Sequence, residues 1–323
     1  MRFRWGILGA ARIASTLIPA IRAAGGEVVM LGAREPDSAR VRDFAASWSI
    51  PHIGSYEDVI SAELGAVYIP LPNHLHRRWG EAAIRASKHV LIEKPLSLNE
   101  AEAQALERVA QDAGRVLLEA FAYRFAPQTL AVMQAVQGGE LGEVRQYRGS
   151  FGFLLGNPDD FRWDPGMGGG SLYDVGCYPV DLARLLLGEP LGVSALARFT
   201  QRGVDTALSG LLDYGPSGAL VSIDSAFDWA PGDMIGRCEI VGSGGHLELE
   251  RAFDSNTADF RLTVNRQVRH VEVGNGYVEM IRHFQAAALG QEALRYTPAD
   301  SVGQARVLDA LLFSAQEKRR VGL

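Results

Sequence analysis

The feature that most constrains the fold is the alternation of short apolar runs with longer helix-like segments over residues 3–118. Strands are expected at 3–8, 28–31, 66–70, 89–92 and 116–118, with a weaker one at 52–53, and helices at 12–24, 38–48, 74–87 and 99–113. Strands separated by helices of this length are typical of a parallel sheet with helices on both faces. The sequence therefore predicts an α/β fold with a doubly wound parallel sheet.

The pattern changes after about residue 125, where residues begin to alternate between apolar and polar. Such runs occur near 143–155, 193–201, 206–214, 218–228, 235–241, 246–251, 259–264 and 267–273. Only two strongly helical segments, 171–187 and 277–289, interrupt them, and a last helix is expected over about 298–319. This pattern predicts an α+β domain with a large, mostly antiparallel sheet and helices on one face.

Composition excludes several classes of function. The net charge of −6 argues against nucleic acid as the main partner, because phosphate backbones attract cationic proteins. Cys177 and Cys238 have neither CxxC nor Cys/His spacing, so we expect no disulfide framework and no metal site. No apolar run approaches a transmembrane helix in length, and Met1–Trp5 leads straight into a strand without a leader pattern. We therefore expect a cytoplasmic protein with no membrane partner.

A loop with the pattern G-x-A-x-x-A, Gly9–Ala14, joins the first expected strand to the first helix. Gly9 permits a tight turn, and the small Ala11 lets the backbone approach a pyrophosphate, which the amino end of a helix favours. We expect Gly9, Ala11, Arg12 and Ile13 to contact a dinucleotide. The alternative is an ordinary tight turn between a strand and a helix.

The second strand ends in Leu31–Glu35, where dinucleotide-binding sheets read the ribose 2′ position. The first charged residue there is Arg34, whose guanidinium can pair with a 2′-phosphate, and Arg40 can assist it. The sequence therefore predicts NADP(H) as the preferred cofactor, with NAD(H) as the second choice. In the alternative, Arg34 only solvates the strand end and Glu35 binds the ribose.

The tripeptide Glu93-Lys94-Pro95 ends the apolar run His89–Ile92. Proline offers no N–H to a strand ladder and restricts the residue before it, so the chain must leave the sheet here, and a cis bond is one way to turn. Ligands of open α/β sheets bind at the carboxyl ends of strands. Lys94 is therefore a candidate catalytic and cofactor-contacting residue, and Glu93 beside it is a further candidate for cofactor contact.

The strand 66–70 is followed by the segment Leu71–His76. Leu71, Pro72 and Asn73 fit the edge of the same cofactor cleft, because the carboxyl ends of parallel strands share one edge of a sheet. His76, on the next helix, is a further candidate for cofactor contact. The alternative is that it is a structural or solvated histidine.

A second dense segment runs from Gly168 to Pro179 and opens with three consecutive glycines. Glycines before a helix permit close approach of a ligand or of another part of the chain. Asp174 and Tyr178 lie four residues apart and so share one helical face. The alternative is that Asp174 caps the helix and Tyr178 is a boundary aromatic.

Together these segments resemble the glucose–fructose oxidoreductase, inositol dehydrogenase and rhizopine catabolism (Gfo/Idh/MocA) family, and most closely its dihydrodiol dehydrogenase and xylose dehydrogenase branch. The matching segments are WGILGAARIA (5–14), VYIPLPNHLH (67–76), KHVLIEKPLSLN (88–99), EAFAYRFAPQ (119–128) and FRWDPGMGGGSLYDVGCYPVDLARLLLG (161–188). Ala11 and Ala33 depart from the family pattern, where a glycine and a serine are common, and Ala126 stands where this branch often has histidine.

The resemblance implies a Rossmann domain over 1–122 and a substrate and dimerisation domain over 123–323, whose last helix, about 298–320, packs back on the first domain. It also implies that Lys94 contacts substrate and nicotinamide, that Asp174 is the carboxylate of the site, and that Tyr178 is catalytic. A homodimer or homotetramer through the second sheet is expected. Candidate substrate contacts border the glycine-led helix: Arg124, Asp160, Arg162 and Trp163.

The expected reaction is hydride transfer between nicotinamide and a sugar or polyol carbon. A tyrosine has an ordinary pKa of about 10, and a nearby ammonium such as that of Lys94 lowers this pKa. Tyr178 can then act as base in one direction and acid in the other. Lys94 would stabilise alkoxide charge, and Asp174 would orient the hydroxyls or Lys94.

Two other functions stay open on the sequence. One is a glycosidase that uses a bound nicotinamide transiently, which would release a sugar from a glycoside with no net change in nicotinamide absorbance. The other is a non-catalytic protein that binds or senses a dinucleotide, which would turn over no sugar. The presence of Lys94, Asp174 and Tyr178 together favours the dehydrogenase over the sensor.

Overall fold

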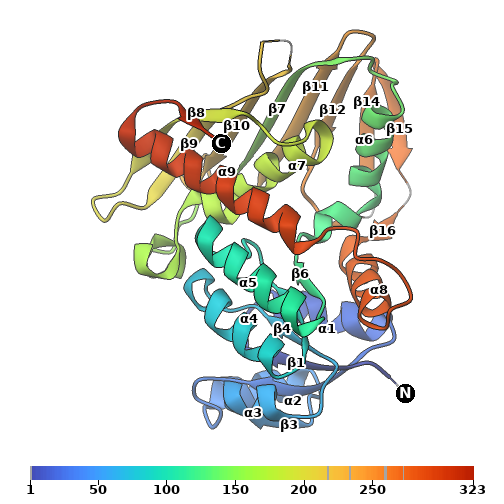
Figure 1. The fold of residues 1–323 in the computed structure, drawn as a ribbon, viewed down its shortest axis with the longest axis vertical. Coiled ribbons are helices and arrows are strands. Elements are labelled where there is room, and N and C mark those ends of the chain that lie inside the picture. Colours follow the sequence, from blue (N-terminus) through green and yellow to red (C-terminus); the bar gives the residue numbers. More distant parts are fainter. Residues whose placement is uncertain (1, 217, 233, 258–259, 272) are drawn as a thin grey trace. The chain divides into compact units, whose positions relative to one another are not determined.

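The computed structural model describes residues 2–216, 218–232, 234–257, 260–271 and 273–323. The chain divides into two compact units (Figure 1). The first unit extends to Ala122 and also contains Tyr277–Val302, and the second contains Tyr123–Gly276 and Gly303–Leu323. Two of the alternating runs expected from the sequence include positions 259 and 272, which lie outside the described residues.

The first unit is built on a six-stranded sheet in the order β3-β2-β1-β4-β5-β6, and all of its strand pairs are parallel. The strands are β1 (Arg4–Leu8), β2 (Glu27–Gly32), β3 (His52–Gly54), β4 (Ala66–Ile69), β5 (His89–Ile92) and β6 (Leu117–Glu119). This order is that of a dinucleotide-binding Rossmann sheet. The central strands are continuous apolar runs because helices cover both of their faces. The predicted doubly wound sheet is confirmed.

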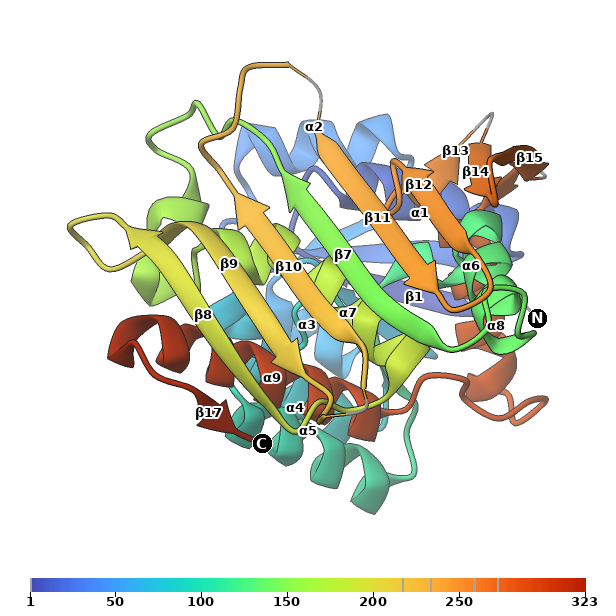
Figure 2. The same ribbon diagram turned by 90° about the horizontal axis from the view of Figure 1, so that it is seen from above.

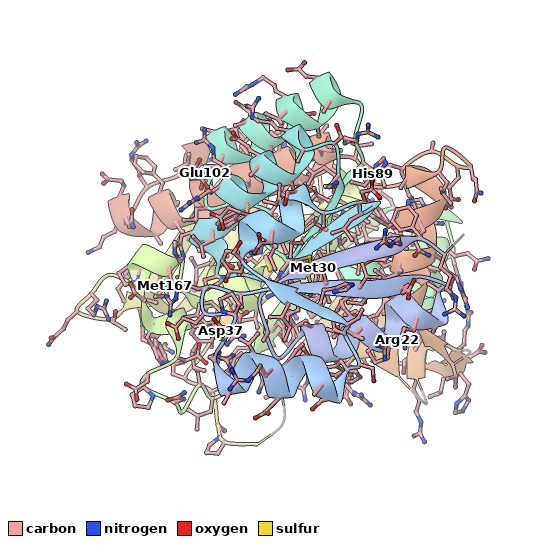
Figure 3. All side chains as sticks on the ribbon, turned by 90° about the horizontal axis from the view of Figure 1, so that it is seen from below. Arg22, Met30, Asp37, His89, Glu102 and Met167 are labelled. Atoms are coloured by element: carbon pink, nitrogen blue, oxygen red, sulfur yellow. The ribbon has the colours of Figure 1, made fainter. Side chains whose placement is uncertain are left out.

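Helices lie on both sides of this sheet, and they are α1 (Ala14–Ala23), α2 (Ala39–Ser47), α3 (Tyr56–Ser61), α4 (His76–Arg85) and α5 (Glu100–Ala113). In Figure 3, Arg22 of α1 and Asp37 before α2 lie on one side of Met30 in β2, and Glu102 of α5 lies on the other.

Helix starts follow the capping signals of the sequence. Ser55 and Asp58, which are spaced as in a capping box, form one at the start of α3, because each side chain accepts from the backbone N–H of the other. Asn99 accepts a hydrogen bond from the Glu102 N–H and caps α5. Local sequence therefore sets where these helices begin.

The helix α8 (Gly276–Ala288) joins the first unit although it follows the second in sequence. The Trp5 indole N–H of β1 donates to Gln285 Oε1 over 3.0 Å, and the rings of Trp5 and Phe284 lie 5.0 Å apart. The single boundary that we expect after residue 122 assigns α8 to the second domain, whereas the chain returns to the first unit there. Sequence reasoning has no access to it, because the paired residues are separated by 280 positions.

The second unit is built on a nine-stranded sheet in the order β15-β14-β12-β11-β7-β10-β9-β8-β17. Its pairs are antiparallel except for β10 with β7. The strands are β7 (Val144–Gly152), β8 (Gly192–Phe199), β9 (Asp205–Asp213), β10 (Leu220–Ala226), β11 (Ile235–Gly242), β12 (His246–Glu250), β14 (Phe260–Val264), β15 (Gln267–Val271) and β17 (Val321–Gly322); β13 (Asn256–Thr257) and β16 (Gly274–Asn275) pair separately. In Figure 2 the face of β7–β12 turned to the viewer carries no helix among the described residues.

The opposite face of this sheet is packed against the segment that carries Asp174 and Tyr178. The expected helix over 171–187 is present, and its first turn, η5 (Leu172–Gly176), is a π-helix that leads into α7 (Cys177–Leu187). Single π-helical turns inside helices occur frequently at functional sites. The last helix, α9 (Pro298–Glu317), begins in the first unit and continues in the second.

One helix of the second unit was not expected from the sequence. This helix, α6 (Pro127–Gln137), begins with a proline in its first turn, where the missing N–H has no intrahelical partner anyway. Its core side includes Gln128 and Thr129, each 1% exposed. Polar residues on the buried side hide the apolar periodicity that sequence reasoning depends on.

No helix within the described ranges is long and apolar enough to cross a bilayer.

Candidate active site

The loop after β1 has the geometry of a dinucleotide cradle. Gly9 has φ +103°, a left-handed conformation, and its N–H donates to Gly32 O over 2.7 Å. A Cβ at this position would lie 3.0 Å from Leu71 Cδ2, a tight contact, and the positive φ strains any residue other than glycine. The Ala14 N–H then donates to Ala11 O over 3.0 Å as α1 begins. The first turn of α1 has no acidic residue, which leaves its amino end suited to a phosphate.

Cationic side chains border this loop. Arg34 follows β2 and is exposed, with its Nε 3.9 Å from Glu35 Oε1. Arg40 of α2 donates from Nη2 to Ala10 O over 3.1 Å, which places a second guanidinium directly at the loop. Arg12 is exposed as well. Exposed ion pairs such as Arg34–Glu35 are weak, so either side chain can turn to a ribose or its phosphate.

The segment after β4 contributes Leu71, Pro72 and Asn73, and Asn73 opens a short 3₁₀ turn that leads into α4. His76 is fully buried behind this turn. Its Nε2 lies 2.7 Å from Leu71 O and its Nδ1 lies 2.8 Å from Pro95 O. Burial lowers the pKa of His76 to about 4. Each ring nitrogen therefore lies next to a backbone carbonyl inside the protein. For this reason we do not propose His76 as a direct contact of the cofactor.

The Glu93-Lys94-Pro95 tripeptide leaves the sheet at the carboxyl end of β5, and the Lys94–Pro95 peptide bond is cis. The Glu93 N–H donates to Ile69 O over 3.1 Å, and Tyr68 Oη donates to the Glu93 carboxylate over 2.6 Å. These bonds hold the backbone directly before Lys94. Within the first unit, β1, β4 and β5 are neighbours, so the Gly9 loop, Leu71–Asn73 and Lys94 follow adjacent strand ends.

In the second unit, a buried carboxylate anchors the start of the glycine-led helix. Asp205 Oδ2 of β9 accepts from Ser171 Oγ over 2.7 Å and from the Leu172 N–H over 2.8 Å. Gly170 has φ +126°, and a Cβ there would overlap Asp205 Oδ1. Burial raises the pKa of Asp205 to about 6, although its hydrogen bonds act in the opposite direction. Only glycine allows the carboxylate to come this close.

Over residues 171–184 of this helix, the half-buried residues are Tyr173, Asp174 and Tyr178, so one side of this part is partly open. The ring of Tyr178 lies among other aromatic rings, 5.2 Å from Phe151 and 5.4 Å from Tyr123 between centroids. Aromatic packing of this kind fixes a ring while its hydroxyl can point elsewhere.

Three of the sequence candidates form one polar cluster. Arg162 donates from Nε to Asp174 Oδ2 over 2.7 Å, and its Nη1 lies 3.2 Å from Asp160 Oδ1. All three side chains are mostly but not fully buried. The guanidinium therefore fixes the Asp174 carboxylate, a pairing that the sequence does not signal because the partners lie on different turns.

The other two substrate candidates lie differently. Trp163 donates from its indole N–H to Asn157 O over 3.0 Å, and its ring lies 5.4 Å from that of Phe227. Arg124 is 1% exposed, and its guanidinium forms a bidentate pair with the fully buried Asp181. Because this guanidinium is engaged within the core, we leave Arg124 out of the proposed substrate set.

Sequence reasoning missed Asp205 and Tyr123. Tyr123 donates its hydroxyl to Asp181 and packs its ring on Tyr178. Neither residue lies in a glycine-rich or proline-marked segment, so no local signal identifies them. Among the described residues, no group of three or more His, Cys, Asp or Glu side chains is placed to hold a metal ion.

Comparisons with known proteins match both units. Residues 3–121 match a family described as an oxidoreductase family with an NAD-binding Rossmann fold, and residues 129–248 match the GFO/IDH/MocA C-terminal domain. The chain is 39% identical to D-xylose 1-dehydrogenase (NADP(+)) 2 of Haloferax volcanii, with 99% of both chains covered. It is 34% identical to trans-1,2-dihydrobenzene-1,2-diol dehydrogenase of Mus musculus, covering 82% of this chain and 78% of the relative.

Solved structures show the same fold. An aldose-aldose oxidoreductase from Caulobacter crescentus, complexed with glycerol, has a TM-score of 0.90 at 27% identity and covers 100% of both chains. A 3-ketoreductase from Actinomadura kijaniata, in complex with NADP and TDP-benzene, has a TM-score of 0.89 at 30% identity and covers 97% of this chain and 98% of the other.

Proposed function

The chain belongs to the GFO/IDH/MocA family of oxidoreductases and is an NAD(P)-dependent enzyme, and from this premise we propose that it transfers hydride between NADP(H) and a sugar or polyol. The observation that carries the proposal is the position of Lys94. It follows β5 in the same sheet in which the end of β1 forms the dinucleotide cradle. Relatives named for xylose, dihydrodiol and aldose chemistry support the substrate class.

The first unit has the groups that a dinucleotide needs. The backbone at Gly9 has a left-handed φ that strains any residue with a side chain, and the amino end of α1 carries no opposing acidic residue. Phosphates can therefore accept hydrogen bonds from backbone N–H groups there. The nicotinamide supplies hydride chemistry when it is bound. The protein's part is to hold the cofactor and to handle the substrate proton.

We assign that proton to Tyr178, with Lys94 and Asp174 as its partners. Tyr178 would take the hydroxyl proton in oxidation and return it in reduction. The Lys94 ammonium would favour the phenolate and stabilise negative charge on the substrate oxygen. Asp174, fixed by Arg162 at 2.7 Å, would accept a hydrogen bond from a substrate hydroxyl or from Lys94. Asp160 would support Arg162, and Trp163 would border the substrate.

The test of this assignment is Tyr178→Phe, which removes only the hydroxyl. We expect turnover to fall by about 10²-fold or more, because general acid–base catalysis contributes at least that much, while NADPH affinity is retained. Tyr214→Phe is the matched control, since the Tyr214 hydroxyl bonds Gly188 O in the same unit. Unchanged turnover in Tyr178→Phe would remove the tyrosine from the mechanism.

NADP(H) is the proposed cofactor because Arg34 and Arg40 lie where a 2′-phosphate would be read. Relatives named for NADP support this choice. Arg34→Ala should lower the ratio of NADP to NAD affinity by about tenfold, the effect of losing one charge-assisted contact. Arg108→Ala, on the opposite side of the sheet in α5, is the control. An unchanged ratio in Arg34→Ala would exclude the 2′-phosphate contact.

We also propose a homodimer or homotetramer in the cytoplasm. The helix-free face of the second sheet carries three exposed leucines, Leu196, Leu211 and Leu220, which are 60–73% exposed. They lie on the adjacent strands β8, β9 and β10, and the register puts them diagonally across from one another on one face. Exposed apolar side chains grouped on one face of a sheet in this way suit contact with a second copy of the chain.

A further inference from the structure

A single imidazole joins two loops of the first unit. His76, the first residue of α4, is fully buried. Its Nε2 lies 2.7 Å from Leu71 O, which follows β4, and its Nδ1 lies 2.8 Å from Pro95 O, which follows β5. Since β4 and β5 are neighbouring parallel strands, the ring bridges their two carboxyl ends.

Each of the two carbonyls belongs to a segment with a role in the proposed site. Leu71 directly precedes Pro72 and Asn73, and its side chain borders the Gly9 cradle, since its Cδ2 lies 3.0 Å from the position of a Cβ built on Gly9. Pro95 directly follows Lys94. The ring therefore connects the edge of the cofactor cradle with the lysine, although it is too deeply buried to contact a ligand itself.

The protonation of the His76 ring determines the nature of its contacts with the two carbonyls. Burial lowers the pKa of His76 to about 4, and the nearby charges of Lys94 and His74 act in the same direction, whereas the two carbonyls oppose them. A neutral imidazole has one N–H, so it donates to one carbonyl and faces the other with a lone pair. Substitutions that keep one donor and remove the other nitrogen can therefore separate the two contacts.

We propose that His76 is a positioning residue that fixes the Leu71–Asn73 edge of the cofactor cradle and the Lys94–Pro95 turn relative to each other. The expected effect on kcat rests on the proposed function, because it assumes that Lys94 is catalytic. The expected effect on the cofactor cradle depends only on NADP(H) binding.

The experiment compares His76→Asn with His76→Gln. The Asn amide nitrogen occupies the place of Nδ1 and can still donate to Pro95 O, whereas the Gln amide nitrogen reaches the place of Nε2 and can donate to Leu71 O. Because the neutral ring has one N–H, one of the two variants loses the single hydrogen bond of the wild type and the other keeps it. If Nε2 carries the N–H, His76→Asn should weaken NADPH binding about tenfold with kcat retained. If Nδ1 carries it, His76→Gln should retain NADPH affinity and lose about tenfold in kcat at saturating cofactor.

Equal effects of the two variants on both quantities, or no effect of either, would overturn the proposal. NADPH affinity is measured by fluorescence titration, which needs no substrate. It therefore tests the effect of His76 on the cofactor cradle even if the wild type oxidises no sugar and the proposed function fails. If neither variant folds, ¹⁵N-histidine spectra of the wild type carry the test. NADP should then shift the ring signals of His76 and leave those of His89, at the amino end of β5, in place; unmoved His76 signals would refute the bridge.

Discussion

The buried carboxylate of Asp205 predicts a specific pH dependence of stability. Its pKa rises from 3.8 to about 6 in the folded chain because the group is buried at the start of the helix that carries Asp174 and Tyr178. A carboxyl group whose folded pKa is raised binds a proton more tightly in the folded state. Its contribution to stability is therefore fully present below the unfolded pKa and is lost as the pH rises through the folded pKa.

The magnitude follows from the size of this shift. Each pKa unit corresponds to about 1.4 kcal/mol, so the move from 3.8 to about 6 amounts to about 3 kcal/mol between acid and neutral pH. Between about pH 4.5 and about pH 7.5, Asp205 should lower the free energy of unfolding by about 2 kcal/mol. Because other groups also titrate in this range, the contribution of Asp205 is obtained as the difference between the wild type and a variant that lacks this carboxyl group.

Asp205→Asn provides that comparison. The amide has the same shape, stays neutral at every pH, and its oxygen can still accept from Ser171 Oγ and the Leu172 N–H. We expect urea unfolding to show that the wild type loses about 2 kcal/mol more than Asp205→Asn over this pH interval. Asp224→Asn, on the neighbouring strand β10, is the matched control for replacing a carboxylate in this sheet. Identical pH dependence of wild type and Asp205→Asn would refute the assignment of a raised pKa to this anchor.

Two further perturbations test the second unit. Asp181→Asn leaves the buried guanidinium of Arg124 without its charged partner and should lower the free energy of unfolding by about 3–5 kcal/mol. Asp228→Asn, in the exposed pair with Arg198, should lower it by at most about 1 kcal/mol. Losses of similar size for the two variants in urea unfolding would contradict the argument. Leu211→Glu places a charge among the exposed leucines and should shift the mass measured by light scattering toward the monomer while circular dichroism still shows a folded chain. An unchanged oligomer would exclude this face as the interface.

The order of strands and helices was predictable because it depends on short-range patterns. Central strands such as β4 are continuous apolar runs, and the capping box at Ser55 and Asp58 marks a helix start within four residues. The alternation in β9 shows which of its faces is buried. Such signals need no knowledge of the rest of the chain.

The parts that escaped prediction depend on partners far away in the sequence. Trp5 packs on Phe284, and this contact brings α8 into the first unit. Arg124 reads as a candidate for substrate binding until Asp181, 57 positions away, is seen to pair with it in the core. His76 shows a related limit, since its position in the sequence signals a cofactor contact, whereas the fold buries its ring against the carbonyls of Leu71 and Pro95.

The central claim is that this chain transfers hydride between NADP and a sugar or polyol with the help of Lys94. The most direct measurement is the nicotinamide absorbance of wild type and Lys94→Ala with a panel of aldoses and polyols, each with NADP and with NAD. We expect the wild type to reduce NADP with at least one member of the panel, and Lys94→Ala to lose about 10²-fold or more in kcat while it still binds NADPH. Full kcat in Lys94→Ala, or no reduction of NADP by the wild type with any member of the panel, would contradict the account.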